Sequence, residues 1–169
     1  MLSPEIDGIK QGALWRLAGN DNLYRCPSDK SLWPYGRQRA PRPFTYALSI
    51  AMNGGYNGIN GAAQVQAVLE RLSSARKASQ LFTFIDEDSE SMTSGTFWVL
   101  GPPEGWYMVP GARDKGSGAN LAFADGHVEF HQWKFLKRHR EGTVTDFKNA
   151  QDTADGQWLV DRIPSGFWQ

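Results

Sequence analysis

The chain has 169 residues, of which 40% are hydrophobic and 12% aromatic, so it can build one sizeable core but is short for two, and we expect a single domain over 1–169. Its 18 Lys and Arg residues balance 18 Asp and Glu residues, which argues against a nucleic-acid-binding protein, because such proteins carry a basic excess. Cys26 is the only cysteine, which excludes an internal disulfide and a metal site built on paired cysteines, and we expect its side chain to be buried.

The N-terminal half is predicted to combine short helices with loops. Helical spacing of apolar residues predicts an amphipathic helix over Pro4–Leu17, and Gly19-Asn20-Asp21-Asn22 ends it. Residues 26–61 are rich in Pro and Gly, which indicates a long loop region with one strand at Phe44–Ile50. Apolar residues at helical spacing predict a second amphipathic helix over Ala62–Ser74.

The C-terminal half is predicted to be rich in strands. Gln80–Ile85 carries apolar groups on both faces, which is typical of a central strand, and Thr96–Leu100 follows as a further strand. Asp125-Gly126 between two alternating segments predicts a two-residue hairpin, and Gln157–Val160 is expected to lie back over the body as a short helix or clasp. Together these elements predict an α+β domain, with a helix packed on an antiparallel sheet and long Gly/Pro-rich loops.

The hairpin prediction decides which side chains share a face of the sheet. With a two-residue loop, Phe123 pairs with Val128 and Leu121 pairs with Phe130, and this apolar face is expected to belong to the core. The opposite face, expected to be polar or half-exposed, then carries His127, Glu129 and His131.

Several separate motifs, in one order along the chain, resemble a single family. This family is the pseudopilin-like proteins of bacterial type II secretion and prepilin-type processing, whose C-terminal signature is a His, nine residues and then Asp-Gly. The matching motifs are Ile9–Leu14, Leu23-Tyr24-Arg25-Cys26-Pro27-Ser28-Asp29, Phe44–Asn53, the acidic strand end Phe82–Asp88, and Asn120–Phe130 with Trp133. The signature departs at one position, because Lys115, and not a His, is separated from Asp125-Gly126 by nine residues.

The resemblance implies both a fold and a role. The implied fold packs an N-terminal helix on an antiparallel sheet, and in the family this helix continues from a processing site and an apolar membrane helix that the present sequence does not contain. The implied role is assembly or display in the cell envelope, with other pseudopilin subunits or secretion-system components as partners. The implied location is the periplasm, the cell surface or the exterior, reached after anchoring in the inner membrane through that helix. This role requires no enzymatic activity.

A run of carboxylates is the candidate metal site. Asp86, Glu87 and Asp88 end the predicted central strand, and together with Asp125 they offer the hard oxygen ligands that calcium takes. The resemblance supports calcium as a cofactor, since major secretion pseudopilins hold calcium in a loop. Adjacent carboxylates on an extended chain point to alternate sides, however, so solvated charge or turn capping by Asp86 is the favoured interpretation.

The hairpin offers a second set of polar candidates. Asp125 has a structural interpretation, since Asp accepts the left-handed backbone of a tight turn. His127, Glu129 and His131 share one face under the predicted register and would suit general acid–base chemistry or a metal. Strand periodicity alone often produces such a trio, so it remains the lesser hypothesis.

Aromatic residues in the loops suggest an alternative function. Seven tryptophans are many for a core of this size, and loop aromatics often form platforms that stack on sugar rings. The alternative is therefore a carbohydrate-active protein that binds or cleaves a uronate-containing polysaccharide. Its candidate sugar-binding residues are Trp33, Tyr35, Trp98, Trp106 and Tyr107. In a lyase, Arg113 or Lys115 would neutralise the uronate carboxylate, and Tyr107 or His127 would carry the proton.

Overall fold

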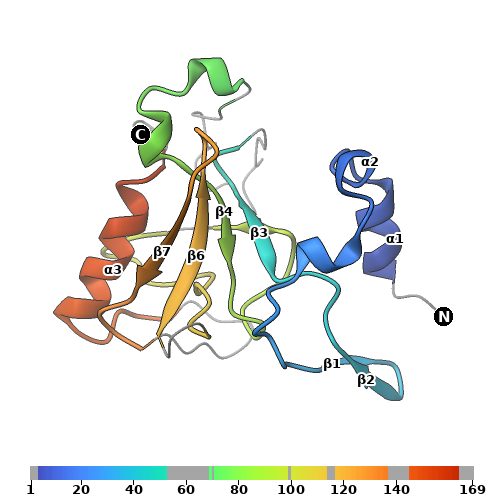
Figure 1. Cartoon of the computed structure of the whole chain (residues 1–169). Coiled ribbons are helices and arrows are strands. Elements are labelled where there is room, and N and C mark those ends of the chain that lie inside the picture. Colours follow the sequence, from blue (N-terminus) through green and yellow to red (C-terminus); the bar gives the residue numbers. More distant parts are fainter. Residues whose placement is uncertain are drawn as a thin grey trace, which may run out of the picture.

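Figure 1 shows the computed structural model of the protein, which describes residues 4–52, 69, 71–98, 100–113, 117–136 and 145–163. Its helices and strands, in chain order, are α1 (Pro4–Gln11), α2 (Trp15–Ala18), the 3-10 helix η1 (Asp21–Tyr24), β1 (Trp33–Tyr35), β2 (Gln38–Ala40), β3 (Tyr46–Ser49), the 3-10 helices η3 (Leu72–Ser74) and η4 (Ala78–Gln80), β4 (Phe82–Asp86), β5 (Thr96–Phe97), β6 (Gly118–Phe123), β7 (Val128–Gln132) and α3 (Ala150–Val160). The fold class is α+β, as the sequence predicts.

Five strands form the main sheet, in the order β5-β3-β4-β6-β7, while β1 and β2 form a separate two-stranded sheet that projects away from it (Figure 1). β4 is the central strand, as its continuous apolar run predicts. The pairs β3–β4, β4–β6 and β6–β7 are antiparallel, but β5 runs parallel to β3. The sheet is therefore mixed, where the sequence predicts a purely antiparallel one.

The main sheet has one buried face and one open face. Ala47, Ile85 and Leu121 lie side by side on β3, β4 and β6, and all three are fully buried in the core. The next row along the sheet faces the other side, because side chains alternate along a strand. That row consists of Leu48, Phe84, Ala122 and Val128. Val128 is 67% exposed, so the open face carries apolar side chains that the core does not cover.

The loop between β6 and β7 has three residues, and the predicted two-residue loop is wrong. The N–H of Phe123 donates to His127 O, and the N–H of Gly126 donates to Phe123 O, each at 2.9 Å. These bonds enclose Ala124-Asp125-Gly126. Gly126 has a φ of 93°, which suits the left-handed residue that completes a three-residue hairpin.

The extra loop residue shifts the register of β7 by one position. Leu121 pairs with Glu129 and Ala122 pairs with Val128, so the predicted pairing of Phe123 with Val128 is wrong. A shift of one residue turns every side chain of a strand to the opposite face. Val128 therefore lies on the open face rather than in the core, and His131 lies on the core side of the sheet.

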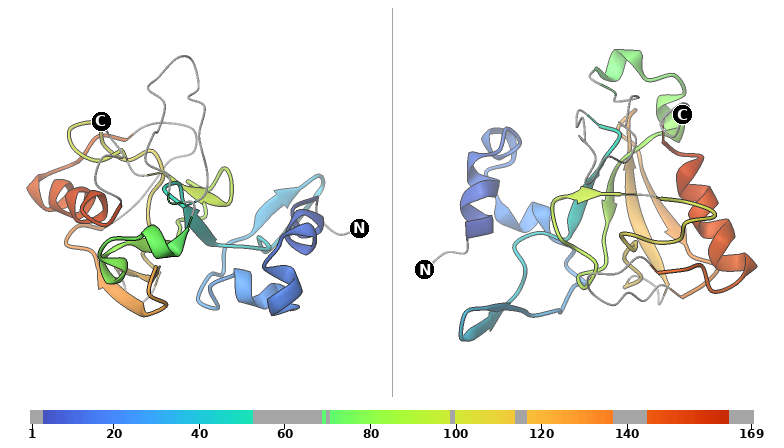
Figure 2. Two further views of the ribbon diagram at one scale, coloured as in Figure 1. Left: turned by 90° about the horizontal axis from the view of Figure 1, so that it is seen from above. Right: turned by 180° about the vertical axis from the view of Figure 1, so that it is seen from behind.

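The predicted N-terminal helix is present but broken in two. α1 ends at Gln11, and the N–H of Gly12 bonds back to Ile9 O at 3.0 Å in a turn before α2 begins. A glycine in the interior of a helix weakens it, which accounts for the break. α1 and α2 stand apart from the sheet (Figure 2) and leave Leu14 and Leu17 50% and 86% exposed. The predicted packing of this helix on the sheet is therefore not what the structure has.

The C-terminal helix α3 supplies the helical side of the core. Leu159 and Ile163 are buried in the same core as the sheet, and Trp158 packs against it. Asn149 caps the start of the helix, and its side chain accepts from the N–H groups of Gln151 and Asp152. The tail thus lies back over the body as predicted. The helix predicted over Ala62–Ser74 falls mostly outside the described residues, which there include η3 at its end.

Candidate functional site

The acidic end of β4 is a buried ion-pair cluster. Asp86 and Glu87 are fully buried, so the interpretation of solvated charge is wrong for these two residues. Arg113 supplies the opposite charge: its Nη1 donates to Asp86 Oδ1 at 2.6 Å, and its Nη2 donates to Glu87 O at 2.6 Å. The same Nη2 lies 3.7 Å from Asp29 Oδ2, so Arg113 connects two buried carboxylates from distant parts of the chain.

The surroundings of Glu87 favour its protonated form. Burial raises its pKa well above its ordinary value, even though Ser91 donates to Glu87 Oε1 at 3.1 Å and Arg42 and Arg113 attract the ionised form. Arg42 and Arg113 both act on Glu87, and Arg113 also lies beside Asp29 and Asp86.

The structure does not assemble the predicted calcium ligands. Phe82 at the start of β4 pairs with Phe123, so Asp125 in the following loop lies at the opposite end of the sheet from Asp86. Arg113 occupies the cation position beside Asp86. Within the described parts of the chain, no group of three or more His, Cys, Asp or Glu side chains is arranged to hold a metal ion. These residues do not fit a calcium site.

Asp125 and His127 form an exposed pair at the hairpin loop. Asp125 Oδ1 accepts from the N–H of His127 at 3.2 Å and lies 2.6 Å from its Nδ1, and these bonds lower the pKa of Asp125. The His127 ring also stacks on Phe123, with ring centroids 4.4 Å apart. Asp125 thus has a structural role in the loop through its side chain, but the expected left-handed backbone is wrong for Asp125, because Gly126 is the loop residue that adopts it.

His131 is placed away from this pair by other contacts. Its ring stacks on Trp158 of α3 with centroids 3.6 Å apart, and burial lowers its pKa. His127, Glu129 and His131 share one face, as predicted, but they do not form a trio. His127 contacts Asp125 and Phe123 at the hairpin loop, whereas His131 contacts Trp158 of α3. Each histidine has a packing role here.

The predicted sugar-binding aromatics lie in separate places. Trp33 and Tyr35 belong to the projecting β1–β2 sheet, and the Arg42 guanidinium lies 3.5 Å from the Trp33 ring centroid. Trp98 and Tyr107 pack against the core and contact each other edge to face, with ring centroids 5.6 Å apart. Trp106 is buried, and its Nε1 donates to Asp152 at 2.9 Å. The structure does not bring the five rings together on one surface.

The predicted lyase residues are also dispersed. Arg113 is engaged by Asp86 at the end of β4, and His127 lies beside the loop at the other end of the sheet. Tyr107 packs against the core, and Lys115 lies outside the described residues. Among the described members of this set, none lies beside another in a cleft.

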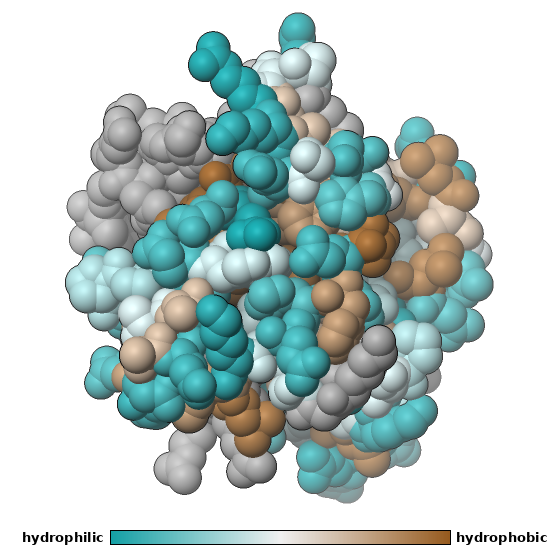
Figure 3. Space-filling model, turned by 60° about the vertical axis from the view of Figure 1, so that its left-hand side comes forward, coloured by the Kyte–Doolittle hydropathy of each residue, from teal (hydrophilic) through white to brown (hydrophobic). Residues whose placement is uncertain are grey.

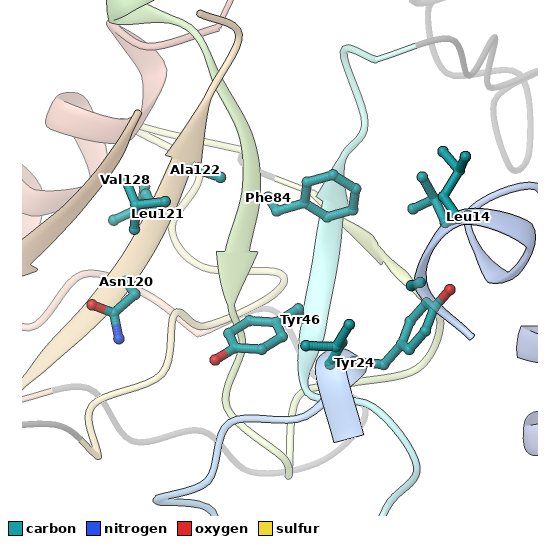
Figure 4. Close-up of a pocket in the computed structure, with 11 residues that line it drawn as sticks. Leu14, Tyr24, Tyr46, Phe84, Asn120, Leu121, Ala122 and Val128 are labelled. Atoms are coloured by element: carbon teal, nitrogen blue, oxygen red, sulfur yellow. The ribbon is translucent and has the colours of Figure 1, made fainter. Parts of the chain in front are cut away.

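An apolar groove that the sequence did not indicate lies between the N-terminal helices and the open face of the sheet (Figure 4). Its volume is about 570 Å³. One wall consists of Leu17 and Ala18 of α2, Leu14 directly before it, and Leu23 and Tyr24 of η1. The other consists of Tyr46, Phe84, Asn120, Leu121, Ala122 and Val128 from β3, β4, β6 and β7.

Exposed apolar side chains concentrate in this groove. Leu14, Leu17, Leu23 and Val128 are four of the six large hydrophobic residues that are exposed in the described structure. By contrast, Figure 3, which brings the α3 side forward, shows mostly hydrophilic surface with smaller hydrophobic patches between. Tyr24 Oη, on the groove wall, is buried and has no hydrogen-bond partner among the described residues. The groove is therefore an apolar surface with a polar atom in one wall.

The sequence missed the groove for identifiable reasons. The predicted two-residue loop places Val128 in the core, and the predicted N-terminal helix, packed on the sheet, covers Leu14 and Leu17. Phe84 carried a usable signal, since it alternates with buried Ile85 and so faces the opposite side of β4. Cys26, in contrast, is buried as expected, and its N–H donates to Thr45 Oγ1 at 2.7 Å.

The described helices and the comparisons with known proteins add two findings. Among the described residues, no helix combines the length and the hydropathy needed to cross a membrane. Comparisons with protein-family models, with curated proteins and with solved structures find no match for this chain.

Proposed function

We propose that this protein is an exported subunit of a pseudopilin-like assembly in the cell envelope, and that it docks on its partners through the apolar groove. The motif order along the sequence supports the family, and the groove supports the role. Contiguous apolar surface is uncommon on soluble monomers, and where it occurs it commonly marks an interaction site.

The single observation that carries the proposal is the clustering of exposed apolar residues on both walls of the groove. Leu17 is 86% exposed and Val128 is 67% exposed, and neither contributes to the core. Burying such a side chain stabilises a complex by about 1.5–3 kcal/mol. A partner that enters the groove would bury both.

The carbohydrate-active alternative has no comparable observation in its favour. Its aromatic residues lie in separate parts of the described structure, and its lyase residues share no cleft there. The described residues therefore favour the assembly function.

The test is site-specific photocrosslinking in cells of the native host. A photoreactive residue at Leu17 or Val128 in the full-length protein is expected to give adducts whose partner, identified by mass spectrometry, is a prepilin-type or secretion-system subunit of the envelope fraction. The same photoreactive residue at Gln157, exposed on the far side on α3, is the control and is expected to give none of these adducts.

A charged substitution provides the matched loss of function. Leu17→Asp and Val128→Asp are expected to abolish the groove adducts and to leave the thermal unfolding midpoint unchanged, because both side chains are exposed. Leu136→Asp, which changes an exposed leucine outside the groove, should leave the adducts intact. Two results would contradict the assembly role. One is that the protein is not found in the envelope fraction, and the other is that Leu17 and Val128 give no adducts with envelope subunits.

A further inference from the structure

The N-terminal wall of the groove belongs to a segment that has few contacts with the main sheet. This segment, residues 4–43, contains α1, α2, η1 and the β1–β2 sheet, and in Figures 1 and 2 it stands to one side of the sheet. Two hydrogen bonds to Thr45, the residue before β3, attach this segment to the sheet. The N–H of Thr45 donates to Tyr24 O at 2.8 Å, and the N–H of Cys26 donates to Thr45 Oγ1 at 2.7 Å. These bonds fix the part of the segment that lies beside β3.

Arg113 provides a second point of attachment. Its guanidinium uses one nitrogen for Asp86 Oδ1 and the other for Glu87 O, both on the sheet side, and the second nitrogen also faces Asp29 Oδ2 of the N-terminal segment. The planar fork of an arginine can hold two directions at once, which the point charge of a lysine cannot do. Asp29 is 3% exposed and Arg113 has a side-chain exposure of 14%, so solvent screens this contact only weakly.

The turn that carries Asp29 is rigidly connected to the groove wall. Asp29 N–H donates to Cys26 O at 3.0 Å, and Arg25 Nη2 donates to Asp29 O at 2.6 Å, so residues 25–29 form one closed turn. Tyr24 of the groove wall immediately precedes this turn. A force on Asp29 is therefore transmitted to the wall through a short, hydrogen-bonded path.

We propose that Arg113 is a positioning residue that fixes the width of the apolar groove by latching Asp29 of the N-terminal segment to the end of β4. The importance of that width for docking rests on the proposed function, but the latch itself does not. Loss of the latch leaves the wall attached near Thr45 and lets it move relative to the sheet.

The test is a distance measurement across the groove. Spin labels are placed on cysteines introduced at Arg16 of α2 and Glu129 of β7, which are both exposed. The background is the 169-residue chain with Cys26→Ala, which removes the natural cysteine. Double electron–electron resonance then gives the distribution of distances between the two labels. Asp29→Asn is the main variant, because Asn keeps the oxygen that accepts from Ser31 N–H at 2.7 Å and removes only the charge that faces Arg113. Asp21→Asn makes the same chemical change at an exposed position of the same segment and is the control.

The expected result is a narrow distribution for the parent and for Asp21→Asn, and a broader one that extends to longer distances for Asp29→Asn. Arg113→Lys keeps the charge beside Asp86 but loses the fork, and is expected to broaden the distribution in the same way. Unchanged distributions in both variants would overturn the latch, whatever the photocrosslinking shows. Broadened distributions would support it even if the groove gave no subunit adducts, so the two proposals fail separately.

Discussion

Burial, and not the neighbouring sequence, sets the chemistry of the acidic residues at the end of β4. Three consecutive carboxylates indicate a solvated or metal-binding run, yet two of them are fully buried. Asp86 is paired with the Arg113 guanidinium from 27 positions further along the chain, and burial raises the pKa of Glu87. No local pattern predicts that partner, because the sheet and the loop after it bring the two positions together.

Glu87 gives the pH dependence of folding a definite sign. Burial raises its pKa in the folded protein above the ordinary value of 4.5, so the folded state binds a proton that the unfolded chain releases. The stability that this proton provides is complete below pH 4.5 and is lost as the pH rises through the raised value. Glu87→Gln mimics the protonated form, and we expect it to be about 1 kcal/mol more stable than the parent at neutral pH.

Urea unfolding at pH 4 and pH 7.5 measures this effect. The gain of Glu87→Gln is expected to be small at pH 4 and larger at pH 7.5, while Glu90→Gln, an exposed change three positions away, should show no difference between the two. A gain of equal size at both pH values would mean that Glu87 is not held protonated.

At the scale of elements, α3 shows how a tertiary contact overrides helix propensity. Replacing a glycine in a helix by alanine normally stabilises the helix by about 0.5–1 kcal/mol. A Cβ at Gly156 would lie 2.5 Å from the Phe147 ring, whereas a Cβ at Gly8 of α1 would meet nothing within 4 Å. The two glycines are thus expected to respond with opposite sign.

We expect Gly156→Ala to destabilise the protein by about 1–3 kcal/mol, because the ring of Phe147 must move out of its contact with Trp106. Gly8→Ala should be neutral or slightly stabilising. Thermal unfolding of the parent and the two variants measures both effects. A higher unfolding midpoint for Gly156→Ala would show that the Phe147 ring can move aside without loss of stability.

The same scale shows which elements the sequence could predict. The central position of β4, the strand β3, the fold class and the returning tail follow from local apolar patterns. The break after α1 and the register of β7 do not, since each depends on one residue: Gly12, which interrupts the helix, and Ala124, which joins the hairpin loop instead of pairing with His127. The predicted register therefore places Val128 in the core instead of the groove.

At the scale of the whole molecule, the groove exists because two parts of the chain face each other across an open space. Sequence patterns can place apolar residues on a face of an element, but they do not state whether a second element covers that face. Here α3 covers one face of the sheet and the N-terminal helices leave the other open. The groove is therefore a property of tertiary structure that no single segment encodes.

An open groove of this kind should bind an apolar dye without any unfolding. We expect the folded protein to enhance the fluorescence of anilinonaphthalene sulfonate, since a cavity of about 570 Å³ lined by apolar side chains is of the size that takes small ligands. Val128→Asp should remove most of this signal and Leu136→Asp should retain it. Equal signals from the two variants would place the dye elsewhere.

The three-residue loop of the hairpin makes the apolar groove sensitive to the deletion of one residue beside it. Deletion of one codon, that of His127, with the three-residue loop kept, would bring Val128 opposite Phe123 and so shift β7 by one position against β6. Val128 would then turn toward the core, and Glu129 would present its carboxylate to the groove in its place. A single in-frame deletion, with every other residue kept, would thus replace an apolar side chain of the groove by a charged one, and related chains that differ by one residue at the start of β7 would differ in what they bind.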